Sequence, residues 1–385
     1  MRILFATGSL VHGGAERHAI TLANRLAERG HECHAVYVKD DPSQLERLDL
    51  REGGSVQCLY ARKYLDLDAL ARLKDLLVQR KPSVLFAANQ YALFYATLAA
   101  RWAGSRAPLA VAYHSTRLQS AKEFAQMLVY RPFFWAADCA VFVCENQRRH
   151  WRRRQVFGRR DLVIHNGVDT EHWKPWSLEE RRRLRGALGL AGEDFVIGMS
   201  AVLRPEKNHV QLVEALAMLR RRGVRARALM IGDGETRGAV ERRARALGVA
   251  PYVTITGFQQ EVRPFVAACD TVALTSFTEA FSLAAIEAMA LGKPVVHSEV
   301  GGAAEMIRPG RNGFLFPVGD TAALVERLAA LSDRAMCERM GAKAREAVEA
   351  QFSERAMVER YEKMLLELET TRTKHENLRR TAGAH

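Results

Sequence analysis

The chain has 385 residues, of which 48% are apolar, 26% are charged and 8% are aromatic. That composition is typical of a globular protein, and it excludes a coiled coil, a disordered chain and a disulfide-rich miniprotein. Lysine and arginine number 57 against 44 aspartates and glutamates, which gives a net charge of +13. This excess favours an anionic partner such as a phosphate, a nucleic acid or an acidic membrane surface. At about 150 residues per domain, the length predicts two or three domains.

Short apolar runs alternate with helical patterns through the first half of the chain. The predicted strands are 3–6, 35–38, 56–59, 84–87, 109–113, 139–143 and 162–164. Strands that alternate with helices indicate βαβ units and a mainly parallel sheet covered on both faces. The first apolar run gives way to polar residues without a small-residue cleavage site, so we interpret it as a strand and not as a signal peptide.

The alternation pauses at 171–192, which holds a proline, two tryptophans and a cluster of charges, and which we interpret as a linker. It resumes with predicted strands at 196–200, 228–231, 253–256, 271–274, 295–297 and 313–315. The predicted fold is therefore α/β, with two doubly wound Rossmann-like domains at 1–170 and 193–353 that face each other across a cleft. Ligands of such sheets bind at the carboxyl ends of the strands. The polar, patternless tail 371–385 is expected to be disordered.

The remaining sequence-wide features argue against a membrane span and a metal site. No run approaches the ~18 uninterrupted apolar residues that a membrane-spanning helix needs. The six cysteines show neither a C-x-x-C pair nor a zinc-like spacing with histidine, so no structural metal and no disulfide frame are expected. We expect a cytoplasmic protein, with a surface patch as the means of any attachment to the inner face of a membrane.

Two glutamates eight residues apart follow one of the predicted strands. Glu279 lies in the loop before a predicted helix and Glu287 about two turns inside it, ~12 Å farther along the axis. The first helical N–H groups, near Phe281, Ser282 and Leu283, lie between them and can bind an anion. A nucleoside-diphosphate sugar suits this spacing, with Glu279 on the sugar hydroxyls and Glu287 on the ribose. Taken alone, the pair is better interpreted as a cap-region acid and a solvated helix residue.

The surroundings of this pair resemble the family-4 retaining glycosyltransferases (glycosyl transferases group 1) of the two-Rossmann-domain GT-B fold. The resemblance extends from residue 1 to about residue 370. The segments that match, in the family's order, are 13–16, 166–169, 231–234, 279–296, 301–305 and 310–313. The resemblance implies that a last helix at 354–370 joins the first domain. It also implies sugar transfer with retention at the anomeric carbon, assisted by the leaving phosphate and without a metal or other cofactor.

The loop after the first strand of the second domain matches the family in part. Lys207 occupies the position of the family's lysine, which faces the donor diphosphate. Val202 stands where the family has an arginine, and Arg204 would share a face with that position if the backbone is extended. The resemblance also places Gly232 at the donor. A dinucleotide fingerprint is not favoured there, because the third glycine comes one residue late, at Gly238.

The first domain would admit the acceptor. His114 ends a predicted strand and resembles the family's cleft histidine, a hydrogen-bond donor beside the sugar and not a general base; a structural role is the alternative. Gly13 and Gly14 would let an acceptor or phosphate approach the backbone, or they form a tight turn. The family usually has glycines at positions 280 and 282, where this chain has Ala280 and Ser282, so the donor sugar is not specified.

The segment 146–157 carries five arginines and Trp151, and the segments 181–185 and 220–227 add positive charge. A solvated face explains such runs. A basic interfacial helix, with tryptophan and arginine stems at anionic lipid headgroups, is the second interpretation, and it suits a lipid-linked acceptor. Nucleic acid is not favoured, because no helix-turn-helix, RNP or zinc pattern accompanies the charge.

These observations lead to one function and two alternatives. The expected function is transfer of a sugar from a UDP-, GDP- or ADP-sugar to a lipid-linked or saccharide acceptor. The family's acceptors suggest synthesis of surface polysaccharide, lipopolysaccharide or glycolipid. Another enzyme on the same fold, such as a nucleotide-sugar epimerase or a phosphorylase, is the first alternative. A non-catalytic protein that binds nucleic acid or membrane through its arginines is the second.

Overall fold

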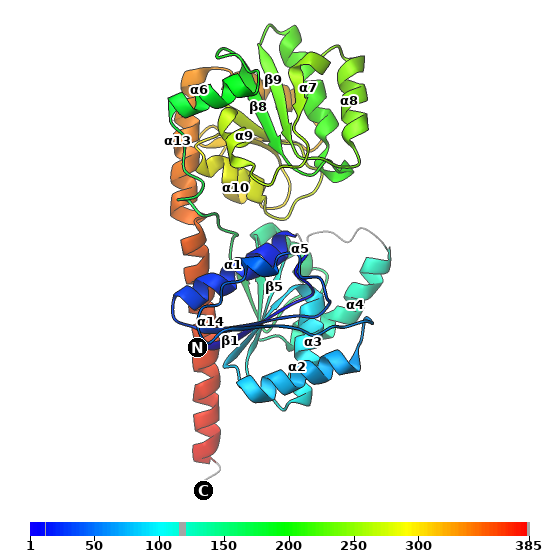
Figure 1. The fold of residues 1–385 in the computed structure, drawn as a ribbon, viewed down its shortest axis with the longest axis vertical. Helices are drawn as coiled ribbons and strands as arrows, with labels where there is room; N and C mark the ends of the chain where they lie inside the picture. The colour runs from blue at the N-terminus through cyan, green and yellow to red at the C-terminus, as the bar shows by residue number, and fades with distance from the viewer. Residues whose placement is uncertain (12, 115–120, 383–385) are drawn as a thin grey trace. The chain divides into compact units, whose positions relative to one another are not determined.

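Two parallel sheets, one of seven strands and one of six, organise the part of the chain that the structure describes (Figure 1). The structure is a computed structural model that describes residues 1–11, 13–114 and 121–382, with the side chains of all but 121–124 and 374–382. One unit comprises residues 1–165 and 357–385, and the other comprises residues 166–356. The fold is thus the predicted GT-B type, with two doubly wound Rossmann-like domains.

The first sheet has the strand order β3-β2-β1-β4-β5-β6-β7, and the direction of winding reverses between β1 and β4. Its strands are β1 (Arg2–Thr7), β2 (Glu32–Tyr37), β3 (Ser55–Cys58), β4 (Val84–Ala88), β5 (Leu109–Tyr113), β6 (Cys139–Phe142) and β7 (Arg160–Val163). Its helices are α1 (Gly14–Glu28), α2 (Leu67–Arg80), α3 (Asn89–Trp102), α4 (Ala121–Ala136) and α5 (Glu145–Arg152). The reversal marks the topological switch point, where open parallel sheets bind ligands.

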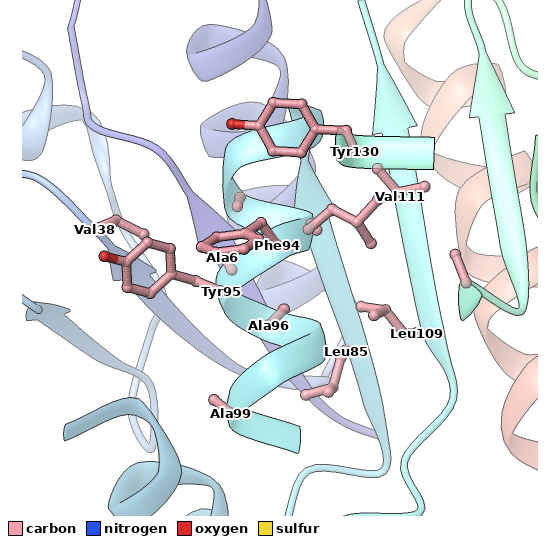
Figure 2. Packing of buried hydrophobic residues seen from close by; sticks show 14 of the residues in the cluster. Ala6, Val38, Leu85, Phe94, Tyr95, Ala96, Ala99, Leu109, Val111 and Tyr130 are labelled. Atoms are coloured by element: carbon pink, nitrogen blue, oxygen red, sulfur yellow. The ribbon is translucent and has the colours of Figure 1, made fainter. Parts of the chain in front are cut away.

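Helices bury both faces of this sheet, which is why its strands are almost continuously apolar. On one face, Phe94 and Tyr95 of α3 pack with Leu85 of β4 and Val111 of β5, and Tyr130 of α4 belongs to the same cluster (Figure 2). On the other face, α1 and the last helix of the chain cover the sheet. The first unit therefore has its own core.

The second sheet has the order β10-β9-β8-β11-β12-β13, with the reversal between β8 and β11. Its strands are β8 (Phe195–Ser200), β9 (Ala226–Ile231), β10 (Val253–Ile255), β11 (Thr271–Leu274), β12 (Val295–Ser298) and β13 (Gly313–Phe316). Its helices are α6 (Leu178–Ala187), α7 (His209–Arg221), α8 (Arg237–Ala246), α9 (Arg263–Ala268), α10 (Leu283–Ala290), α11 (Ala303–Met306), α12 (Thr321–Leu331) and α13 (Arg334–Gln351). All thirteen predicted strands have a counterpart in the two sheets, displaced by no more than a few residues at either end.

The last helix, α14 (Glu354–Ala382), belongs for most of its length to the first unit. Tyr361 and Leu365 are fully buried against the first sheet. Glu362 accepts a hydrogen bond from His31 Nε2 at 2.7 Å. These contacts explain why a helix so late in the sequence is part of the N-terminal core.

Two sequence-based expectations differ from the structure. The segment 171–192 is not a free linker, because α6 lies within it and packs on the second unit, where Arg185 pairs with Asp270. The tail is helical from Thr371 to Ala382, although disorder was expected from its polar composition. Thr371 and Thr373 donate to carbonyl oxygens one turn earlier, so these hydroxyls are satisfied within the helix. The last three residues lie outside the described part.

Candidate functional site

The loops that follow β8 and β11 meet at the switch point of the second sheet. The side chain of Thr275, fully buried just after β11, places Oγ1 3.0 Å and 2.9 Å from the carbonyl oxygens of Lys207 and Asn208. Lys207 ends a short 3-10 helix, and Asn208 has a left-handed backbone with φ of 53°. A buried hydroxyl between two carbonyls thus fixes the backbone from which the Lys207 side chain extends.

Lys207 and Glu279, which the sequence analysis assigned separately to the donor, form an ion pair. Lys207 Nζ lies 2.5 Å from Glu279 Oε2, with 27% and 18% of the two side chains exposed. The two residues are 72 positions apart and meet because β8 and β11 are neighbours in the sheet. Since the pair is only partly desolvated, both charges remain within reach of a ligand.

The glycine pair at 301–302 packs against the backbone of the Glu279 loop. Gly301 has φ of 55°, and a Cβ at this position would overlap the carbonyl oxygens of Glu279 and Ala280. Gly302 N donates to Ala280 O at 2.8 Å. Gly301 and Gly302 therefore hold the Glu279 loop in place. The sequence alone indicated this glycine pair only as part of the family resemblance.

Helix α10 begins later than the predicted anion-binding N–H groups. Ser282 is the N-cap, and its Oγ accepts from the N–H of the third helical residue at 3.3 Å. The first two N–H groups of the helix belong to Leu283 and Ala284, which have no carbonyl partner one turn earlier in the helix. Phe281 is buried, with its ring centroid 5.6 Å from that of Phe352. The helix-start N–H groups expected at 281–283 are thus those of Leu283 and Ala284, and Phe281 packs in the core.

Glu287 lies in the second turn of α10 and is partly exposed. Its Cα is four residues from the first helical residue, Leu283, which is ~6 Å along the helix axis. Along the chain, the first helical N–H groups therefore lie between Glu279 and Glu287.

Arg204 is exposed in the loop after β8, and its own backbone is extended, with φ of −119° and ψ of 158°. The N–H of Arg204 donates to the carbonyl of Val202 at 2.8 Å, which makes a tight turn at Leu203. The condition under which Arg204 would share a face with Val202, an extended backbone between them, is therefore not met at Leu203. Both side chains are nevertheless exposed beside the segment that carries Lys207.

Gly232 supports that same loop from the neighbouring strand. With φ of 144°, it lies where a Cβ would overlap the carbonyl oxygen of Ala201. Gly234, with φ of 156°, approaches the carbonyl of Leu203 in the same way. Leu203 N also donates to Asp233 O at 2.9 Å. The glycines of this motif thus allow the loops after β8 and β9 to pack backbone against backbone.

His297 is a residue that the sequence analysis missed. It lies in β12 opposite Leu274 of β11, with its side chain fully buried. Its Nδ1 donates to Ser298 O at 2.7 Å, whereas its Nε2 has no hydrogen-bond partner among the described residues. Burial lowers the pKa of His297, with the carboxylate of Glu279 acting in the opposite direction. The only sequence signal was a histidine at the end of an otherwise apolar strand.

His114 lies in the first unit, just after β5. Its backbone N–H donates at 3.1 Å to the side chain of Asn89, which has a left-handed φ of 67° at the end of β4. Its ring centroid is 4.6 Å from that of His18 in α1, and His18 lies 5.1 Å from Tyr361. Burial lowers the pKa of His114 to about 4, so its imidazole is neutral at physiological pH. Asn89 and His18 are further residues that no motif indicated.

The Gly13-Gly14 turn begins α1 at the switch point of the first sheet. A Cβ on Gly13 would overlap the carboxylate of Glu16, which folds back over the helix start. Burial raises the pKa of Glu16. Gly14, by contrast, has open space beside its Cα. The approach expected at both glycines is thus restricted at Gly13 by Glu16 and remains open at Gly14.

The arginine-rich segment does not present its tryptophan to the surface. Trp151 is fully buried, with its ring 5.1 Å from that of Tyr113, and Gln147 one turn earlier is also buried. The interpretation that places Trp151 among lipid headgroups is therefore wrong. Arg149, Arg153 and other arginines of this segment are exposed.

Neither a cluster of metal ligands nor a membrane-spanning helix is present in the part of the chain that the structure describes. No three His, Cys, Asp or Glu side chains there are grouped so that they could hold a metal ion. None of the described helices is both long and apolar enough to cross a bilayer.

The sequence matches two families, one for each half of the chain. Residues 12–172 match Glycosyltransferase Family 4, and residues 180–347 match Glycosyl transferases group 1. The lipopolysaccharide core biosynthesis glycosyltransferase LpsE of Rhizobium meliloti is 28% identical over 361 residues, 92% of this chain and 96% of that protein. EpsD of Bacillus subtilis is 31% identical over 224 residues, which is 58% of each protein.

Solved structures show the same fold over nearly the whole chain. HepE of Anabaena in complex with UDP has a TM-score of 0.84 at 25% identity, covering 95% of this chain and all of that one. Its complex with UDP-glucose has a TM-score of 0.81 at 26% identity, with the same coverage.

Proposed function

Because the chain belongs to the family-4 and group-1 glycosyltransferases, we propose that it transfers a sugar from a nucleoside-diphosphate donor to an acceptor hydroxyl with retention. The observation that carries this proposal is the ion pair of Lys207 and Glu279 at the switch point of the second sheet. A cation for a diphosphate and a carboxylate for sugar hydroxyls are the two groups that such a donor requires.

A nucleoside-diphosphate sugar could replace the partner of each charge in this ion pair. A diphosphate oxygen would take the ammonium of Lys207, and sugar hydroxyls would donate to the carboxylate of Glu279. Each charge would then have a new partner, so the pair opens without leaving either charge unpaired. The N–H groups of Leu283 and Ala284, and the guanidinium of Arg204, would add positive potential around the diphosphate. Glu287 would accept from the ribose hydroxyls.

Lys207 would also assist the chemical step. Negative charge grows on the diphosphate as the bond to the anomeric carbon breaks, and a cation held in position stabilises that charge. In a retaining transfer assisted by the donor, the acceptor hydroxyl attacks from the side that the phosphate leaves, and the phosphate oxygen takes its proton. No metal is required in this scheme, because Lys207, Arg204 and the helix start neutralise the diphosphate.

The first unit would bind the acceptor beside Gly14 and His114. A neutral His114 can donate one hydrogen bond and accept another, which suits a hydroxyl group better than a phosphate. Asn89 holds its backbone in place. We infer that His114 orients a hydroxyl at the reacting end of the substrates and does not act as a general base.

The relatives suggest where to begin with substrates. The neighbouring structures of HepE contain UDP and UDP-glucose, and LpsE is named for lipopolysaccharide core synthesis. We propose a UDP-sugar as the first donor to test, and an acceptor from surface polysaccharide or lipopolysaccharide synthesis, acting at the cytoplasmic side of the membrane.

The test is a thermal-shift screen against UDP-, GDP- and ADP-sugars, with and without a chelator. A donor at 100 times its dissociation constant should stabilise the protein by about 2.7 kcal/mol, and Lys207→Ala should reduce this shift. Analysis of the products with an acceptor then distinguishes glycosyl transfer with retention from the release of free or isomerised sugar, which an epimerase or phosphorylase would give. The absence of a shift with every donor would contradict the proposal.

A further inference from the structure

Helix α4 lies at the periphery of the first unit (Figure 1), and several of its apolar side chains are exposed. Leu128, Val129 and Trp135 are 45%, 59% and 44% exposed. Ala125 and Pro132 are exposed as well. Residues three and four positions apart lie on one side of a helix, so these five side chains form a stripe ~15 Å long. We call Ala125, Leu128, Val129, Pro132 and Trp135 the α4 stripe.

The opposite side of α4 already fills the core. Met127, Tyr130 and Phe134 are buried at the same helical spacing and belong to the cluster shown in Figure 2. A surface helix normally turns a polar face to water, and a helix that is apolar on both sides needs a second covering. The α4 stripe is therefore not explained by the packing of the first unit.

A turn rich in arginine packs against the end of the α4 stripe. Trp135 Nε1 donates to the carbonyl oxygen of Gln155 at 2.9 Å, and its ring centroid is 6.3 Å from that of Phe157. Arg153 and Arg154 directly precede Gln155 and are exposed. The segment that sequence analysis placed at a membrane through Trp151 is thus joined to a different tryptophan, Trp135.

The charge around the α4 stripe is positive. The segment 125–137 contains no aspartate or glutamate. Along the chain, the nearest acidic residues are Glu123 before this segment and Asp138 after it. Asp138 pairs with Arg159 at 3.1 Å, and Asp161, in the strand after the arginine turn, pairs with Arg152 at 3.0 Å. Arg149 and Arg153 have no ion-pair partner among the described residues. An apolar stripe with a basic edge thus remains.

We propose that the α4 stripe and the adjoining arginine turn dock the protein on an anionic phospholipid bilayer. The apolar side chains would enter the interface between headgroups and acyl chains, where the indole of Trp135 is well suited. The exposed arginines would remain at the level of the phosphates, where each adds attraction to an anionic surface. The helix would lie along the bilayer and not cross it.

The proposal is tested on the full chain without any sugar nucleotide, so its outcome is independent of the glycosyl-transfer reaction. Co-sedimentation is measured with vesicles of phosphatidylcholine alone and with vesicles of an equal mixture of phosphatidylcholine and phosphatidylglycerol. We expect binding to the mixed vesicles, with an affinity that falls as salt is added. Val129→Glu should weaken this binding by roughly tenfold or more, because it places a carboxylate within the apolar stripe.

Val78→Glu is the matched control. Val78 lies on α2 of the same unit with 53% exposure, close to the 59% of Val129. The substitution Val78→Glu therefore makes the same change of charge elsewhere on the surface. It should bind the mixed vesicles nearly as wild type does. Arg153→Glu should weaken binding to the mixed vesicles and leave any residual binding to phosphatidylcholine unchanged.

Three outcomes would overturn the proposal. Wild-type protein that does not sediment with the mixed vesicles excludes the bilayer as the partner. An equal loss of vesicle binding in Val129→Glu and Val78→Glu shows that binding responds only to the net charge of the protein. A self-association of wild type in solution that Val129→Glu abolishes, measured by analytical ultracentrifugation without vesicles, assigns the stripe to a second copy of the chain.

Discussion

The two edges of the second sheet each hold a lysine in a polar cluster, and the two clusters differ in how their charges are satisfied. At the amino edge, Lys293 is buried and donates to the carbonyl oxygens of Ala267 and Cys269 at 2.8 Å and 2.7 Å. Arg185 donates to a third carbonyl at the end of α9 and pairs with Asp270. At the carboxyl edge, Lys207 has a single ion pair with a carboxylate that is itself partly exposed.

The size of a cavity does not identify the site. A cavity of about 770 Å³ lies at the amino edge, lined by Arg181, Arg185, Asp270 and Lys293 among others. These cations already cap the carbonyls at the C-terminus of α9, where a helix favours positive charge. A ligand there would have to displace hydrogen bonds that complete the fold. A ligand at the carboxyl edge would only exchange the partners of an ion pair. Lys293, which lies in the matching segment 279–296, is therefore expected to be structural.

The comparison predicts a large loss of stability at the amino edge. Lys293→Ala removes the donor to two carbonyls and leaves a cavity, so the free energy of unfolding should fall by about 3 kcal/mol. Denaturant unfolding measures this loss. Lys207→Ala is the matched control and should cost less than about 1 kcal/mol, because its ion pair is partly exposed. A folded Lys293→Ala of wild-type stability that has lost turnover would reverse the assignment of the two lysines.

At the carboxyl edge the prediction concerns rate and not stability. Lys207→Ala and Glu279→Ala should each reduce turnover at least tenfold, or about 1.4 kcal/mol in activation free energy. Because the two residues are partners, the double variant should lose less than the sum of the single losses. Steady-state kinetics of the three variants test this. Near-normal rates in both single variants would remove the proposed donor site.

The sheet architecture was predictable because its signals are local. Continuous apolar runs such as 109–113 and 271–274, separated by helical spacing, define strands of a covered parallel sheet without any knowledge of tertiary contacts. The segment 171–192 was predicted to be a linker, because the helix α6 inside it is mainly charged and shows no apolar periodicity. Its attachment depends on Arg185 reaching Asp270, 85 residues away, which no local pattern shows.

The site was predictable only as a set of separate residues. Lys207 and Glu279 each stood in a motif, but their contact depends on the order of β8 and β11 in the sheet. His297 and Asn89 belong to no motif and were missed. Trp151 was assigned to the surface from the arginines around it, although Gln147 four residues earlier shares its buried side. Burial of single residues in a charged run depends on the packing partner, here Tyr113.

A smaller effect should appear in the pH dependence of stability at the amino edge. Burial, followed by the charge of Arg181, lowers the pKa of Lys293 to about 7 from an ordinary value of 10.5. The unfolded chain therefore binds more protons than the folded chain between these two values, and stability should rise with pH through this group. From pH 7 to 8 the gain of wild type over Lys293→Met should be about 1 kcal/mol. If the difference in unfolding free energy between wild type and Lys293→Met stays constant from pH 7 to 8, this prediction is wrong.

The smallest expected effect is that of Arg204, which has no hydrogen bond or ion pair from its side chain among the described residues. An exposed guanidinium that meets the diphosphate only from solvent contributes little, so Arg204→Ala should raise KM for the donor about two- to threefold and leave kcat nearly unchanged. The effect should shrink at high salt, because the interaction is screened. Val202→Arg restores the family's arginine and should lower KM. If Arg204→Ala instead reduces kcat as much as Lys207→Ala does, the Arg204 guanidinium stabilises the leaving diphosphate directly. The turn at Leu203 would then place Arg204 in the role of the family's arginine, whose position Val202 occupies.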